Sequence, residues 1–155
     1  MSVDVEVVRS VSDELVEAFG RLLPQLSGSA EAPDAGTLRA LVNWPGNHLL
    51  IAWVDGEILG TLTLVTFPIP TGLRAWIEDV VVDEAARGRG VGAALTHEAV
   101  RLAREAGART VDLTSRPSRA AANRLYERLG FQVRDSKVYR LAELPEPAPR
   151  TPAGS

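Results

Sequence analysis

Apolar and polar residues follow two different periods along the chain, and these periods predict its elements. The segment 3–8 alternates apolar and acidic residues, as a strand with one wet face does. After Ser12, a good helix cap, the apolar residues recur at helical spacing as far as Leu26. Asp55-Gly56 separates two apolar runs and is a strong signal for a two-residue hairpin. The first half therefore predicts strands at 3–8, 49–54, 58–67 and 75–82, and helices at 12–26 and 37–44.

The second half alternates helix and strand. Val91, Leu95, Leu102 and Ala106 mark one face of a helix that Gly107 ends. Beyond it we expect a strand at 110–114, a helix at 120–129, and a hairpin of strands at 131–133 and 137–141. The order β-α-α-β-β-β-α-β-α-β-β predicts an α/β fold with a mixed sheet flanked by helices. Residues 1–144 are expected to form one domain, and the proline-rich segment 145–155 is expected to be disordered.

Composition narrows the classes of function. The 155 residues are 45% hydrophobic and 24% charged, as in an ordinary soluble domain, and no apolar run could span a bilayer. The net charge of −3 argues against a general nucleic-acid binder. With no cysteine, and with His48 and His97 far apart, no metal site is expected. Absence of cysteine also fits a reducing, cytoplasmic location.

The segment 80–95 carries the most distinctive chemistry. It runs from a β-branched strand through the glycine-rich turn 87–92 into a helix. Free amides at a helix start attract anions, glycines let a phosphate approach the backbone, and arginine side chains match phosphate oxygens. We interpret the turn as an anion cradle rather than a plain helix cap. A dinucleotide fingerprint fits less well, because residues 83–87 separate the strand from the glycines.

Two motifs resemble the GNAT superfamily of acetyl-CoA-dependent N-acetyltransferases. Arg87-Gly88-Arg89-Gly90-Val91-Gly92 is similar to its R/Q-x-x-G-x-G/A signature, and the segment 123–131 resembles its L-Y-x-x-x-G-F segment. The motifs stand in the family's order and at its usual separation. The resemblance spans nearly all of residues 3–141 and implies a mostly antiparallel central sheet, acetyl-CoA as acyl donor and an amine acceptor. A homodimer is expected from the resemblance alone.

The resemblance also implies where the coenzyme would lie. Backbone groups of the glycine-rich turn would hold the diphosphate, and the last residues of the preceding strand would pair with the pantetheine arm. A bulge in that strand would open the slot for the thioester. Where the family often has an asparagine seven residues before its tyrosine, this chain has an arginine. The expected coenzyme-binding residues are Val80, Val81, Val82, Arg87, Gly88, Arg89, Gly90, Val91, Gly92, Ala93, Arg119 and Asn123.

Acetyl transfer to nitrogen needs a neutral amine and a proton for the leaving thiolate. A lysine-like amine costs about 4–5 kcal/mol to deprotonate at pH 7. Glu78, on the strand beside the expected thioester, is the candidate base, acting through water; the alternative is a surface carboxylate. Tyr126 is the candidate general acid, and the alternative is a packing role.

The sequence therefore predicts an N-acetyltransferase that acts on a primary amine. The acceptor half is expected from the early helices and from residues 27–47 and 68–74, which carry no charge cluster that would name the acceptor. Two alternatives stay open: a coenzyme-binding module without turnover, and, less favoured, a dinucleotide-binding protein.

Overall fold

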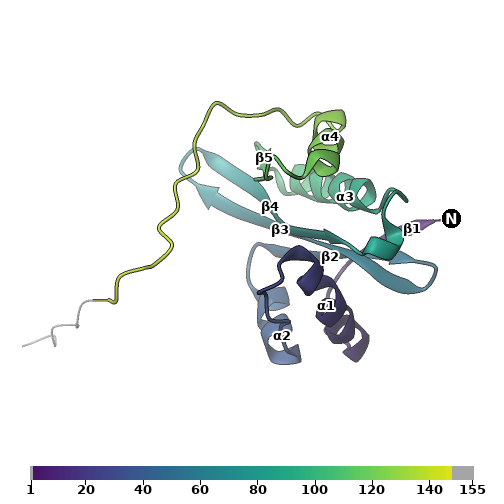
Figure 1. The fold of residues 1–155 in the computed structure, drawn as a ribbon. Helices are drawn as coiled ribbons and strands as arrows, with labels where there is room; N and C mark the ends of the chain where they lie inside the picture. The colour runs from purple at the N-terminus through teal and green to yellow at the C-terminus, as the bar shows by residue number, and fades with distance from the viewer. Residues whose placement is uncertain (1, 148–155) are drawn as a thin grey trace, which may run out of the picture.

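The computed structural model describes residues 2–147 and contains a five-stranded sheet with helices on both faces (Figure 1). The strands lie in the order β1-β2-β3-β4-β5; neighbours are antiparallel except β4 and β5, which are parallel. This arrangement confirms the mixed α/β class. The elements are β1 (Val3–Val7), α1 (Asp13–Leu26), α2 (Ala35–Asn43), β2 (Asn47–Val54), β3 (Glu57–Ile69), β4 (Gly72–Val82), a 3-10 turn η1 (Glu84–Ala86), α3 (Val91–Ala106), β5 (Val111–Asp112) and α4 (Ala120–Arg128).

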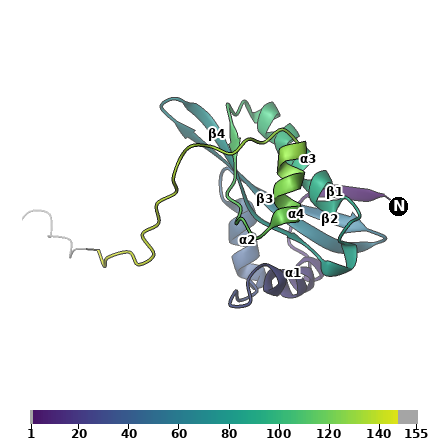
Figure 2. The same ribbon diagram turned by 45° about the horizontal axis from the view of Figure 1, so that its top comes forward.

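The sheet divides the hydrophobic core into two layers. Helices α1 and α2 cover one face, and α3 and α4 lie on the other (Figures 1 and 2). Strand β2 is buried on both sides: Leu50 and Ala52 pack toward α3, whereas Leu49 and Ile51 pack toward α1 and α2. A strand covered on both faces needs a continuous apolar run, and this explains why alternation is absent there.

Short-range signals in the sequence fix several element ends as predicted. The Ser12 hydroxyl accepts a hydrogen bond from the amide of Leu15 at 3.1 Å and so caps α1. Asp34, which was not predicted as a cap, caps α2 in the same way through the amide of Thr37, so this helix begins at Ala35 rather than at the expected residue 37. Asp55 and Gly56 both have positive φ, 50° and 81°, as the tight turn between β2 and β3 requires.

Strand β3 and helix α3 approach each other closely at Gly60. A Cβ atom on Gly60 would lie 2.7 Å from Cγ1 of Val91 and 3.1 Å from Cδ1 of Leu95. Carbon atoms in ordinary contact are about 3.5–4.0 Å apart, so no larger residue fits without movement. This contact sets the height of the first turn of α3 above the sheet.

The expected hairpin of strands at 131–133 and 137–141 is wrong, because the segment after α4 forms no strand. Its side chains face solvent, with Val133 91% and Tyr139 89% exposed. The neighbouring edge strand β5 has only two residues and offers few hydrogen-bonding groups for pairing. An isolated two-stranded hairpin without a covered face is marginal in water. The segment therefore runs away from the sheet (Figure 1).

Two further expectations concern strand β5 and the C-terminal segment. The strand expected at 110–114 is reduced to Val111–Asp112. In the expected tail, residues 145–147 are irregular and exposed, and residues 148–155 lie outside the described residues. Between residues 2 and 147, no helix is both long and apolar enough to cross a membrane.

Candidate functional site

The glycine-rich turn presents a row of free amides at the start of α3. Gly88 and Gly90 have φ of 79° and 78°, in the left-handed region that glycine adopts without strain. Gly90 is the N-cap, and no side chain caps the helix. The amides of Gly88, Gly90, Val91, Gly92 and Ala93 find no acceptor among the described residues. Such a row, together with the helix dipole, favours an anion.

Strand β4 contains a bulge just before it reaches this turn. Thr61 pairs with Val81 and Thr63 pairs with Glu78, so β4 uses one residue more than β3 between these pairs. Asp79 within it has φ of 50°, and a bulge of this kind bends the strand. On its other side β4 pairs with β5 only at Ala75 and Trp76. From residue 77 onward, no described strand pairs with that edge of β4, so its hydrogen-bonding groups border the neighbouring space.

A cavity of about 570 Å³ opens between the end of β4, the start of α3 and the face of α4. It reaches across the sheet to the end of α1, because Gln25 and Leu26 also line it. Eleven of the predicted residues are in its wall: Val80, Val81, Val82, Arg87, Gly88, Gly90, Val91, Gly92, Ala93, Arg119 and Tyr126. Segments that are far apart in the sequence therefore meet around one space.

The charge of this cavity differs from that of the whole chain. Its wall contains the three arginines Arg87, Arg119 and Arg128 and, among the described residues, no aspartate or glutamate. The chain as a whole carries a net charge of −3. Guanidinium groups bind phosphate oxygens well, so the cavity suits a phosphorylated ligand.

Two predicted coenzyme-binding residues use their polar groups elsewhere. The Arg89 guanidinium lies 3.8 Å from a carboxylate oxygen of Asp55, and its amide donates to the carbonyl of Ala86. The side-chain amide of Asn123 donates to the carbonyl of Arg116 at 3.1 Å. Neither residue lines the cavity. Asn123 instead closes the turn that precedes α4.

Tyr126 is held in place by the end of its own helix. The amide of Phe131 donates to the carbonyl of Tyr126 and that of Gly130 donates to Glu127, with Gly130 at φ of 98°. This is a Schellman motif, in which the residue after the glycine packs on the last helical turn. The rings of Phe131 and Tyr126 meet edge to face with centroids 5.8 Å apart. The motif thus explains why glycine and phenylalanine follow the tyrosine at this spacing.

Burial raises the pKa of the Tyr126 phenol above its usual value, and the nearby charge of Arg119 opposes part of that rise. The hydroxyl is therefore protonated at neutral pH and is able to donate a proton. Its ring lines the cavity at half burial. These features suit a general acid, while the contact with Phe131 also gives the ring a packing role.

Glu78 lies beside the cavity rather than in its wall. The indole N–H of Trp76 donates to its Oε1 atom at 2.7 Å, which fixes the exposed carboxylate on one face of β4. This is the face toward α1 and α2, because Val81 on the same side of the strand packs in their core layer. Glu78 is two residues from Val80, which does line the cavity.

Sequence reasoning missed several residues of the wall. Around α4 they include Ser118, Ala120, Ala121, Ala122, Leu125 and Arg128, and at the end of α1 they are Gln25 and Leu26. Positions 121, 122, 125 and 128 recur every three or four residues and share one helix face. Helical spacing counted from the tyrosine motif would have found Arg128. Nothing in the sequence pointed to the end of α1.

No metal centre is evident in the described residues. Between positions 2 and 147, no three histidine, aspartate or glutamate side chains lie close enough together to hold an ion.

Comparison with known proteins gives a consistent result. The model of the acetyltransferase (GNAT) family matches residues 11–131. The chain is 46% identical over 138 residues to a rice (Oryza sativa subsp. japonica) protein named "Probable glucosamine 6-phosphate N-acetyltransferase 2", covering 82% of this chain and 81% of that one. It is 31% identical over 96 residues to the N-alpha-acetyltransferase MAK3 of Arabidopsis thaliana; the match covers 62% of this chain and about half (50%) of that protein.

Solved structures agree on the fold. A putative acetyltransferase from Agrobacterium tumefaciens superposes with a TM-score of 0.77 at 25% identity, over 92% of this chain and all (100%) of the other.

Proposed function

The chain belongs to the acetyltransferase (GNAT) family, and from that premise we propose that it transfers the acetyl group of acetyl-CoA to a primary amine. The observation that carries the proposal is the cationic cavity, in which free amides at the start of α3 adjoin the unpaired edge of a bulged β4. A phosphate group and an extended amide-containing chain are the two ligands that such surfaces suit. Coenzyme A contains both.

In this proposal each part of the coenzyme has its own support. The diphosphate accepts hydrogen bonds from the amides of Gly88 and of residues 90–93. Arg87, Arg119 and Arg128 add charge around it. The pantetheine arm lies along residues 80–82 like an added strand. The thioester then points toward the bulge, between Tyr126 and Glu78.

The proposed reaction is a direct transfer. The lone pair of the neutral amine attacks the thioester carbon, a C–N bond forms, and the C–S bond breaks. The coenzyme thiolate takes a proton from the Tyr126 hydroxyl, whose pKa is raised by burial. The surplus proton of the amine passes through water to the Glu78 carboxylate, which the Trp76 indole orients. A lysine-like acceptor must first lose its ammonium proton to become this neutral amine, which costs about 4–5 kcal/mol at pH 7.

The test is release of free thiol from acetyl-CoA in the presence of a panel of amines. The names of the relatives supply two members, glucosamine 6-phosphate and a peptide with a free α-amino group. Simple alkylamines complete the panel. Amine-dependent thiol release supports the proposal. Tight acetyl-CoA binding by calorimetry without release for any amine would favour a binding module, and tighter binding of NAD than of acetyl-CoA would favour a dinucleotide protein.

We also propose that the chain forms a homodimer. Five large apolar residues of the segment after α4 are exposed, and the outer edge of β5 has no strand partner among the described residues. Pairing of this segment with a second copy would cover both. Light scattering in solution tests the idea, and a monomeric mass at high micromolar concentration would contradict it. The exposed residues are Val133, Val138, Tyr139, Leu141 and Leu144.

The cytoplasmic location expected from the composition stays a prediction.

A further inference from the structure

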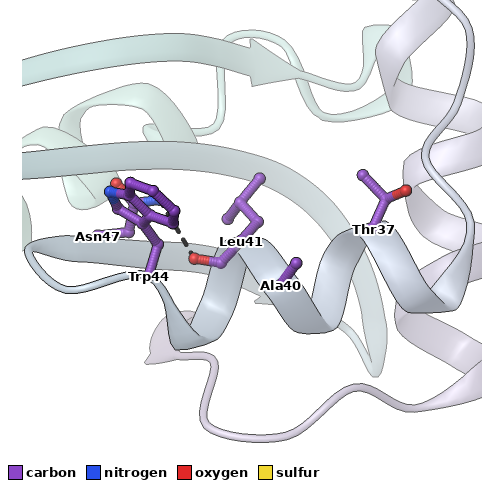
Figure 3. A pocket seen from close by; sticks show the side chains of 5 residues that line it. All are labelled: Thr37, Ala40, Leu41, Trp44 and Asn47. Atoms are coloured by element: carbon purple, nitrogen blue, oxygen red, sulfur yellow. Dashed lines mark hydrogen bonds between the residues drawn. The ribbon is translucent and has the colours of Figure 1, made fainter. Parts of the chain in front are cut away.

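A second hollow lies beside the end of α2, separate from the coenzyme cavity. It has a volume of about 400 Å³ and is lined by Thr37, Ala40, Leu41, Trp44 and Asn47 (Figure 3). Trp44 is 68% exposed, the only aromatic side chain of this wall. The side-chain amide of Asn47 donates one hydrogen bond to the Leu41 carbonyl at 3.2 Å, so one of its two N–H groups is used within the wall. The surface offered to a ligand is therefore mainly apolar, and none of the lining residues is charged.

Strand register places this hollow on the same sheet face as Glu78. Asn47 pairs with Val65 on β3, and Val65 pairs with Trp76 on β4. Residues directly opposite on adjacent strands project to the same side of a sheet. Trp76 in turn donates to the Glu78 carboxylate. A continuous row of side chains thus joins the hollow to the proposed base.

The separation follows from sheet geometry. Two strand spacings of about 4.8 Å place Asn47 roughly 10 Å from Trp76, and Glu78 lies about 7 Å farther along β4. The resulting distance between the Cα atoms of Asn47 and Glu78 is on the order of 12 Å. A ligand about 10 Å long could have one end at the base and the other in the hollow. None of the five lining residues takes part in the coenzyme cavity.

We propose that the hollow beside α2, with Trp44 as its main wall, binds an apolar group of the acceptor. Preferred acceptors are then primary amines that carry an aromatic or branched aliphatic group about 10 Å from the nitrogen. This inference rests on the proposed function. It disfavours a phosphorylated sugar as the acceptor at this subsite, because the wall contains no cation for a phosphate.

The test compares two acceptors that differ only at the far end, 6-phenylhexylamine and 6-aminohexanol. Differences of one small apolar group in a protein pocket change kcat/KM by about 10- to 200-fold. We expect the phenyl compound to have a kcat/KM at least about 10-fold higher in the wild type. Trp44→Ala should remove most of this advantage and leave kcat/KM for 6-aminohexanol unchanged within about twofold, so the hydroxyl compound is an internal control.

A second variant guards against loss of folding in the first. Ala40 is exposed on α2, so Ala40→Glu is compatible with the helix and places a carboxylate in the hollow. It should lower the phenyl preference by about 10-fold as well. Equal kcat/KM for both amines, or equal loss for both in Trp44→Ala, overturns the inference while the proposed function stands. Turnover of other amines but of neither hexylamine also overturns it. If none of the amines causes thiol release, that result would instead refute the proposed function.

Discussion

The contact at Gly60 couples the stability of the fold to the position of the amide row, and Gly60→Ala tests that coupling. The added Cβ would lie 2.7 Å from Cγ1 of Val91 and 3.4 Å from the Val81 carbonyl oxygen. Val91 is the first residue of α3 and is only 1% exposed, so its side chain has no open space to enter. The start of α3 must therefore move away from β3.

The size of the effect can be worked from these distances. Restoring an ordinary carbon contact requires a shift of roughly 1 Å. Overpacking of this kind costs about 1–3 kcal/mol, which in a chain of this length lowers Tm by roughly 2–12 °C. The same shift moves the amides of residues 90–93. Loss of one hydrogen bond to a charged phosphate costs about 1.5–3 kcal/mol and weakens acetyl-CoA binding by roughly 10-fold or more.

Two measurements check the prediction together. Denaturant unfolding gives the free energy of unfolding, and calorimetry gives the Kd for acetyl-CoA. Gly20→Ala is the matched control: Gly20 lies within α1 with nothing within 4 Å of its added Cβ, so this variant should gain about 0.5–1 kcal/mol and bind normally. A Gly60→Ala variant with wild-type stability would refute the packing argument. Lower stability with unchanged Kd would refute the coupling to the amide row.

Three further predictions concern single side chains. Tyr126→Phe keeps the ring contact with Phe131 and removes the hydroxyl, so kcat should fall by roughly 10²–10⁴ while the Kd for acetyl-CoA stays within about threefold; an equal loss in both would assign the residue to packing. Glu78→Gln should lower kcat more at pH 6 than at pH 9, since the free amine becomes abundant at high pH, and a pH–rate profile parallel to that of the wild type would contradict the base role. Burial, helped by the charge of Arg9, lowers the pKa of His48, so the unfolded chain binds the proton first as pH falls. As the pH falls below about 6.5, the free energy of unfolding, measured by urea unfolding, should therefore decrease in the wild type and decrease less in His48→Gln. His97→Gln, at an exposed histidine, is the control. If the free energy falls equally steeply with pH in the wild type and in His48→Gln, His48 does not cause the effect.

The candidate site shows which of its features the sequence motifs predict. The sequence predicts the glycine-rich turn and the tyrosine segment as parts of the site, and both line the cavity, since the local sequence sets the backbone geometry of each. The contacts of two polar side chains differ from those predicted. Arg89 and Asn123 lie within the motifs, yet their polar groups bind Asp55 and the Arg116 carbonyl. A motif predicts which residue stands at a position, whereas the contact that a long side chain makes depends on which groups the tertiary fold places near it.

Features that depend on neighbours within a few residues follow directly from the sequence: the Ser12 cap, the Asp55-Gly56 turn, and the glycines with positive φ at residues 88, 90 and 130. These conformations are set by steric limits and hydrogen bonds inside one short segment. The bulge at Asp79, the close approach at Gly60 and the absence of strands after α4 arise only when elements far apart in the sequence pack together. Each of these depends on the register and reach of a second element, because a strand exists only where another strand offers its edge.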